Sequence, residues 1–341
     1  MELRKIFKYR NVWIGVAMMW IVFVHSGFRF DSVFWMRFKE FGYGGVDICL
    51  FASGIGCYYS LEKDPDILRF LKRRIKRLGP TYLCFIIPWL WWTKKLSGLP
   101  IPAAIGNILG VQTLASWDYK FNWYISGLLV FYICMPYLKS LADTCEKWQQ
   151  DVLVGLMFAV ISVSFWNTGK NLIIIVTRLP VLYAGVVLAK MAHREYILKK
   201  SDCLLLGMLS VFGLICLLYC YYEWTEALWY CGLYWYPFAL IVPGVCVFLS
   251  LLVERTEKYR AVRYMYGLLE LIGVYSFEVY LVHIFMYEEF IPEISKRFHI
   301  VFDNQMWLLT IPLIACGAFV MKRLGTFAGK LLEHIVANKK A

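Results

Sequence analysis

The sequence contains few charged residues and no long polar segment. Of its 341 residues, 18% are Asp, Glu, Lys or Arg, whereas 60% are hydrophobic and 18% are aromatic. A soluble domain of this length would show long polar loops, so the composition excludes that class and predicts a polytopic helical membrane protein. We expect one membrane-embedded domain, residues 1–341, with no appended soluble domain.

Metal-type cysteine spacing and internal repeats are also missing. The eleven cysteines are scattered, and none forms a CxxC pair. We therefore expect no metal site and interpret the cysteines as small packing residues. No internal repeat is visible, which argues against a transporter built from inverted repeats.

The hydrophobic runs predict an all-α bundle of about ten transmembrane helices. A helix needs about 20 mostly apolar residues to cross a bilayer. The expected spans are residues 11–28, 43–61, 78–96, 121–141, 151–168, 171–191, 203–222, 228–253, 267–290 and 305–325. Residues 100–115 are apolar but interrupted by Pro and Gly, so we expect a re-entrant or interfacial segment there.

The net charge of +12 lies in short loops between the apolar runs. This placement argues against nucleic acid as a partner and favours membrane lipid. With the N-terminus inside, the inner segments hold 26 Lys and Arg residues and the outer segments hold nine. The bias predicts that both termini lie on the cytoplasmic side.

The first expected span contains one ionisable residue, His25. It follows Arg10 by about 22 Å of helix rise, which places it in the outer half of the membrane. Intramembrane ionisable residues are costly, so His25 is a candidate functional residue, although it could simply bond to a neighbouring helix. Asp47 opens the second span at the same face and could orient the His25 ring, or it could cap its own helix.

A basic run, residues 72–77, precedes the third expected span. Arg74 and Arg77 are three residues apart, so they share one helix face and can bind phosphates bidentately. The run therefore predicts a site for a nucleotide-bearing cofactor that comes from the cytosol. Binding of anionic lipid is the alternative.

Other polar and aromatic residues of the expected spans are candidates for lining a site. Arg178 needs a partner inside the membrane, for which Glu278 is a candidate. Glu278 and His283 are five residues apart and do not closely share a helix face. Buried hydrogen bonding between helices could explain each of them, and an aromatic belt at the interface could explain Trp123 and Tyr124.

Five short motifs occur in order along the chain. They are Phe23-Val24-His25-Ser26, the segment GGVDICLFASG at 44–54, Arg74-Ile75-Lys76-Arg77 with Pro80 and Tyr82, Trp123-Tyr124, and Tyr280-Leu281-Val282-His283. Each motif is weak alone, but together the chain resembles the acyltransferase-3 family of integral membrane O-acyltransferases over nearly its whole length.

The resemblance implies a cytosolic acyl-CoA donor and a hydroxyl of a cell-surface polysaccharide or glycolipid sugar as the acceptor. It implies that His25 is catalytic and that Arg74 and Arg77 contact the donor. Many members carry an Arg eleven residues before this His, where the present chain has Ile14; Arg10, one turn earlier, is the nearest candidate. We expect acetyl as the transferred group and a bacterial inner or plasma membrane as the location.

These arguments define one set of expected site residues. They are His25 and Asp47 as catalytic residues, Arg74, Arg77 and Arg10 as donor-binding residues, and Ser53, Tyr82, Trp123, Tyr124, Arg178, Glu278, Tyr280 and His283 as site-lining residues. His25 could act as a general base or carry the acyl group covalently.

Two other function classes fit part of the pattern. A transporter or flippase for an anionic substrate could use Arg178 with the intramembrane His and Glu residues as a relay. A non-catalytic subunit could bind lipid through the basic run, but it would need no base at His25. The ordered motifs favour the enzyme over both.

Overall fold

The computed structural model describes residues 2–98, 100–116, 122–165, 170–223, 225, 227–228 and 232–338. Over these ranges the chain is helical, and its β-structure is limited to an isolated bridge between Glu2 and Ile197. The all-α prediction is therefore confirmed. The expected spans 121–141, 151–168 and 228–253 include a few residues outside the described ranges.

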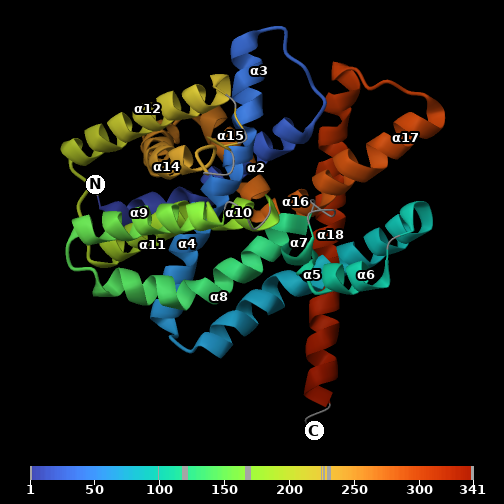
Figure 1. The fold of residues 1–341 in the computed structure, drawn as a ribbon, viewed down its shortest axis with the longest axis horizontal. Helices are drawn as coiled ribbons and strands as arrows, with labels where there is room; N and C mark the ends of the chain where they lie inside the picture. The colour runs from blue at the N-terminus through green and yellow to red at the C-terminus, as the bar shows by residue number, and fades with distance from the viewer. Residues whose placement is uncertain are drawn as a thin grey trace.

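The first half of the chain forms the centre of the molecule and one side of it (Figure 1). Its helices are α1 Leu3–Ile6, η1 Phe7–Tyr9, α2 Arg10–His25, α3 Val33–Glu40, η2 Phe41–Gly44, α4 Gly45–Lys63, α5 Ile67–Ser97, α6 Ile101–Ile108, α7 Gln112–Ala115, α8 Trp123–Thr144 and α9 Trp148–Ser164.

The second half completes the bundle. Its helices are α10 Lys170–Val176, α11 Leu179–His193, α12 Lys200–Tyr222, α14 Tyr236–Thr256, α15 Arg260–Val274, α16 Ser276–Phe285, the π-helical η4 Met286–Phe290, α17 Ile291–Phe298 and α18 Asn304–Asn338. The C-terminal part of α18 extends beyond the other helices (Figure 1).

The expected count of ten membrane-crossing helices is not confirmed. Six described helices are long and apolar enough to cross a membrane, or up to seven if the bent pair Arg260–Val274 and Ser276–Phe298 counts as one span. The expected spans 43–61 and 78–96 fall on α4 and α5, which do not meet this test. Most of α4 is buried against other helices, so it needs less hydropathy than a helix that faces lipid.

Glycines let the central helices approach backbone to backbone. A Cβ on Gly185 of α11 would lie 2.2 Å from the Phe51 carbonyl oxygen of α4, and one on Gly15 of α2 would lie 1.9 Å from the Leu269 oxygen of α15. Small residues at helix crossings permit such contact inside a membrane. These glycines therefore let α4 pack closely against α11 and α2 pack closely against α15.

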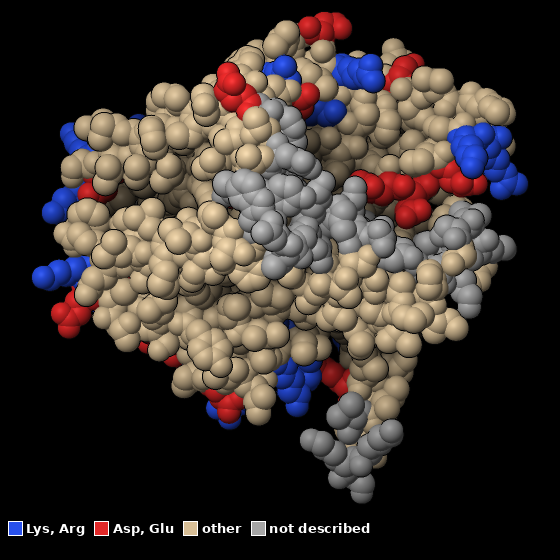
Figure 2. Space-filling view, in the orientation of Figure 1, with Lys and Arg blue, Asp and Glu red and all other residues tan. Residues whose placement is uncertain are grey.

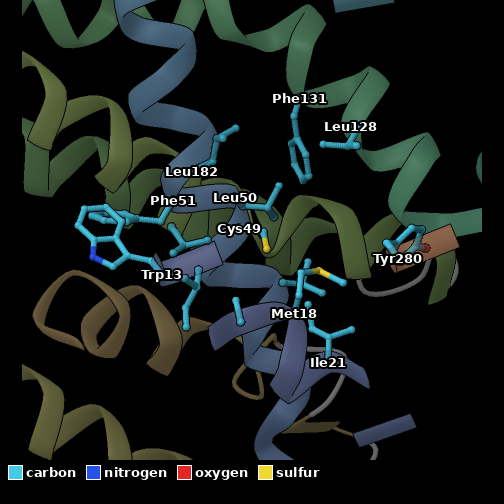
Figure 3. Close-up of a cluster of buried hydrophobic side chains, with 14 of the residues drawn as sticks. Trp13, Met18, Ile21, Cys49, Leu50, Phe51, Leu128, Phe131, Leu182 and Tyr280 are labelled. Carbon is cyan, nitrogen blue, oxygen red and sulfur yellow. The ribbon is translucent and has the colours of Figure 1, made fainter. Parts of the chain in front are cut away.

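A cluster of apolar side chains fills the space around α2 and α4 (Figure 3). Trp13, Leu50, Phe51 and Leu182 are each at most 1% exposed. Met18 and Ile21 of α2 point toward Tyr280 at one side of this cluster (Figure 3). This core therefore packs together the helices whose side chains line the cavity described below.

The outer surface is apolar over much of its area. In Figure 2, Lys, Arg, Asp and Glu lie in small separate groups, and broad areas of the described surface carry neither sign of charge. Six large apolar side chains of α12 are more than half exposed: Leu204, Leu205, Met208, Val211, Phe212 and Ile215. An exposed apolar surface of this extent is typical of contact with lipid.

Candidate active site

A cavity of about 330 Å³ runs between α2, α4, α5, α8 and α16. Its size is within the usual range for small-molecule sites. Along α2 it extends from Arg10 to Ile21, or about 16 Å of helix rise. We call the end near Arg10 the basic end and the other the deep end.

Three arginines line the basic end. Arg10 comes from the first turn of α2, whereas Arg74 and Arg77 come from α5. Among the described residues, none of the three makes a salt bridge with a carboxylate. Three unneutralised guanidinium groups around one cavity form a site for an anion with several charged oxygens.

Three cations close to Arg74 and Arg77 along α5 are neutralised: Arg69, Arg73 and Lys76. Arg69 and Arg73 contact the Asp64 carboxylate, with nitrogen–oxygen distances of 3.0 and 2.5 Å. Their guanidinium groups hold the pKa of Asp64 well below its ordinary value. Lys76 contacts Glu333 of α18 at 3.2 Å. Arg74 and Arg77, the arginines of the run that line the cavity, are therefore not neutralised by a carboxylate of the described residues.

Packing holds the free guanidinium groups in place. The Arg74 group lies over the rings of Phe70 and Tyr132, at 4.9 and 5.7 Å from their centroids. A Cβ at position 56 would lie 2.7 Å from the Arg10 Nη1 atom, so Gly56 makes room for that side chain. The cluster is thus built by residues of α2, α4, α5 and α8 together.

Two tyrosines close the deep end of the cavity. The rings of Tyr124 and Tyr280 lie 4.8 Å apart, and Ile21 faces the same space. His25 follows Ile21 by one turn of α2, about 6 Å, and His283 follows Tyr280 by three residues. The two histidine rings lie 5.2 Å apart, just beyond the deep end.

Both histidines use Nδ1 to bond to their own helix. His25 Nδ1 lies 2.8 Å from the Ile21 carbonyl oxygen, and His283 Nδ1 lies 3.0 Å from that of Val279. A carbonyl only accepts, so Nδ1 donates in each ring and Nε2 of the neutral ring carries the lone pair. His283 is fully buried and its Nε2 has no partner among the described residues, whereas His25 keeps exposed surface. Of the two histidines, His25 is therefore the one with an accessible side chain.

Asp47 does not contact His25. Its Oδ1 lies 3.7 Å from the Arg178 Nε, and both side chains are 1% exposed. The neighbours Val46 and Cys49 line the cavity, so Asp47, one residue after Val46, lies about 100° around α4 and faces α11 instead. The expected pairing with His25 is wrong in this geometry; Asp47 compensates the charge of Arg178.

Arg178 and Glu278 also differ from the expected pairing. The Arg178 guanidinium lies between Trp123 and Trp235, at 4.9 and 5.5 Å from the ring centroids. Glu278 instead contacts Lys322 of α18 at 3.1 Å. Among the described residues, these charges therefore form two separate pairs.

Tyr82 holds the wall of the site from outside the cavity. Its hydroxyl donates to the Asn107 carbonyl and accepts a 2.9 Å bond from the Asn122 amide. Both asparagines are fully buried, so this network ties α5 to α6 and to the start of α8. Tyr82 therefore supports the position of Tyr124 and does not line the cavity.

The cavity brings together six of the expected site residues: Arg10, Ser53, Arg74, Arg77, Tyr124 and Tyr280. Ile14 also lines it, one turn from Arg10. Among the lining residues not expected, Tyr132 follows Tyr124 by eight residues, and this spacing places both on one face of α8. Over the described ranges no cluster of three or more His, Cys, Asp or Glu side chains could hold a metal ion.

Apolar helices around a cation-lined cavity that leads to a histidine pair define an integral membrane protein with a site for a charged ligand. A family model described as an acyltransferase domain matches residues 11–321. The chain belongs to the acyltransferase-3 family and is a membrane acyltransferase. No curated protein and no solved structure matches it.

Proposed function

We propose that the protein transfers an acyl group, with acetyl favoured, from cytosolic acyl-CoA to a hydroxyl of a cell-surface polysaccharide or glycolipid sugar. One observation carries the proposal: a single cavity begins at three unneutralised arginines and ends at Ile21 and Tyr280, each about one helical turn before a ring of the His25–His283 pair. A phosphate-bearing donor fits the first feature, and proton transfer fits the second.

The donor would bind along the length of the cavity. Its phosphates would contact Arg10, Arg74 and Arg77 at the basic end. The thin pantetheine arm would follow the α2 side of the cavity toward Tyr280. The thioester would then lie near His25, about one helical turn beyond the last lining residue of α2.

His25 would act as a general base toward the acceptor. Its Nε2 accepts the hydroxyl proton while the oxygen attacks the thioester carbonyl and forms a C–O bond. The C–S bond then breaks, and the leaving thiolate takes the proton from the imidazolium. Transfer through an acyl-histidine is the alternative route, in which Nε2 itself attacks the carbonyl.

The proposed orientation places the basic end in the cytosol and His25 toward the outer side of a bacterial inner or plasma membrane. It is supported by the cations gathered at the basic end, where Arg4, Lys5 and Lys8 precede α2 and the basic run 72–77 carries Arg74 and Arg77. In the bundle, α2 begins at the basic end of the cavity and ends at His25. Donor and acceptor would therefore enter from opposite sides.

Deleting the gene from its own host should remove base-labile acyl groups from the surface glycans, and wild-type protein should restore them. The measurement is the acetate released by mild base per sugar from extracted polysaccharide and glycolipid. A transporter predicts a different result: less glycan on the surface, with an unchanged acyl content per sugar. That outcome, or unchanged glycans, would contradict the proposal.

A further inference from the structure

A second cavity of about 280 Å³ is lined by residues that do not line the donor cavity. Its lining consists of Glu40, Phe41, Tyr43, Tyr221 and Tyr234. The first three come from the end of α3 and from η2, and Tyr221 comes from the end of α12. Four aromatic rings and a carboxylate thus surround a small space at the ends of the helices.

The Glu40 carboxylate of this cavity is held in place by hydrogen bonds to one of its two oxygens. Glu40 Oε2 accepts a 2.7 Å bond from Arg37 and a 2.9 Å bond from the Tyr221 hydroxyl. The described bonds leave its Oε1 available to accept another donor. The Arg37 guanidinium lies 4.0 Å from the centroid of the Tyr221 ring, and its buried Nε has no partner among the described residues.

The tyrosine rings are fixed by bonds from their hydroxyls to backbone carbonyls. The Tyr43 hydroxyl donates to the Tyr234 carbonyl at 3.2 Å, and the Tyr234 hydroxyl donates to the Cys220 carbonyl at 2.6 Å. Phe41 packs edge-on against Tyr221, with centroids 5.9 Å apart. The aromatic walls are therefore preorganised for a ligand, which reduces the entropy that binding would cost.

This cavity is tied to the end of α2 that carries His25. The Lys39 ammonium is buried and donates a 2.7 Å bond to the carbonyl of Ser26, the residue after His25. The Trp20 indole donates a 2.7 Å bond to the Phe38 carbonyl. Glu40 directly follows Lys39. The end of α3 that forms part of the cavity wall is therefore bonded to the backbone next to His25 (α3, top of Figure 1).

The chemistry of the cavity differs from that of the donor site. Its described lining contains no guanidinium, and the nearby Arg37 is neutralised by Glu40, so the cavity is not built for a phosphate. Aromatic rings bind apolar ligand faces, and a carboxylate accepts hydrogen bonds from hydroxyl groups. A sugar ring offers both kinds of surface, and a volume of about 280 Å³ is close to the lower end of the range for small-molecule sites.

We propose that the cavity formed by Glu40, Phe41, Tyr43, Tyr221 and Tyr234 binds one saccharide unit of the acceptor. The inference rests on the proposed function, because it assigns the acceptor subsite of the same reaction. The bound unit would lie beside the sugar whose hydroxyl reaches His25. It would thus hold the glycan and set which sugar is acylated.

The test uses full-length protein in liposomes, radiolabelled acetyl-CoA, and host surface glycan from which mild base has removed the acyl groups. Glu40→Gln and Tyr221→Leu should each raise the half-saturating glycan concentration about tenfold, as expected for one lost charge-assisted bond or ring contact. The dissociation constant of labelled CoA should stay within twofold. The matched control is Glu223→Gln, an exposed carboxylate two residues beyond Tyr221 that does not line the cavity.

Each other outcome overturns the inference in a distinct way. If both variants resemble Glu223→Gln, the cavity does not bind the acceptor. If CoA binding weakens together with glycan transfer, the residues support the fold and not a subsite. If wild-type protein binds and cleaves acetyl-CoA but labels no glycan, the saccharide assignment is wrong while acyl transfer stands; if it does neither, the proposed function fails and the subsite fails with it.

Discussion

Replacing His25 with alanine should lower acyl transfer at least a hundredfold and leave CoA binding within twofold of the wild type. A positioned general base contributes about 10²- to 10⁴-fold to a rate. His25 has an exposed side chain whose Nδ1 is already bonded, so its Nε2 is the basic atom that can meet the acceptor. It does not line the donor cavity, and so the phosphates should bind as before. The measurement is the initial rate of label transfer from acetyl-CoA, together with equilibrium binding of labelled CoA.

His193→Ala is the matched control. His193 is half exposed at the other end of the helices and lies 3.5 Å from Glu62, so its loss should change the rate less than twofold. Equal rates for His25→Ala and His193→Ala would remove His25 from the mechanism. A fall in CoA binding for His25→Ala would instead indicate that the substitution disturbs the fold of the cavity.

Replacing Arg74 and Arg77 together with alanine should weaken CoA binding at least a hundredfold. A hydrogen bond to a charged group contributes about 1.5–3 kcal/mol, and about 1.4 kcal/mol corresponds to a tenfold change in the dissociation constant. Both guanidinium groups line the cavity and neither is neutralised by a carboxylate of the described chain. The measurement is equilibrium binding of labelled CoA at two salt concentrations, because loss of two charges should also flatten the salt dependence.

The same helix offers a control with identical chemistry. Arg69 and Arg73 belong to the same basic segment, but both contact Asp64 and neither lines the cavity. The double variant Arg69→Ala and Arg73→Ala should therefore change CoA binding less than threefold. If the two double variants weaken binding equally, the basic segment attracts anions in a general way and the cavity is not the donor site.

The sequence predicted site features that follow from the free-energy cost of placing an ionisable side chain in lipid. An uncharged run with a single histidine indicated His25, because an ionisable side chain in a membrane is rarely there without a role. The spacing of Arg74 and Arg77 predicted a shared helix face, and the structure places both on one cavity with Arg10. Ile14, which stands where many members of the family carry an arginine, lies one turn from Arg10 along the same wall.

The partners of the buried charges could not be predicted from sequence. Asp47 was expected beside His25, but its direction depends on the rotation of α4 about its axis, which close packing against α11 sets. Glu278 was expected near Arg178, yet Ser276 and Tyr280 line the cavity and Glu278 contacts α18. The direction in which each of these side chains points is set by contacts between segments that are far apart in the sequence.

The expected number of spans is not confirmed, for a related reason. Counting hydrophobic runs assumes that each helix faces lipid. Most of α4 is enclosed by other helices, so its length and hydropathy do not report whether it crosses the membrane. The bend of 72° between Arg260–Val274 and Ser276–Phe298 likewise falls inside the apolar run 267–290, which the sequence predicted as one continuous span.

The most direct test of the central claim is an experimental structure of the protein with a non-hydrolysable thioether analogue of acetyl-CoA. The account predicts that the phosphates contact Arg10, Arg74 and Arg77, that the pantetheine arm follows α2 past Tyr280, and that the acetyl end lies beside His25. Phosphates bound away from these arginines, or an acetyl end far from His25, would contradict it.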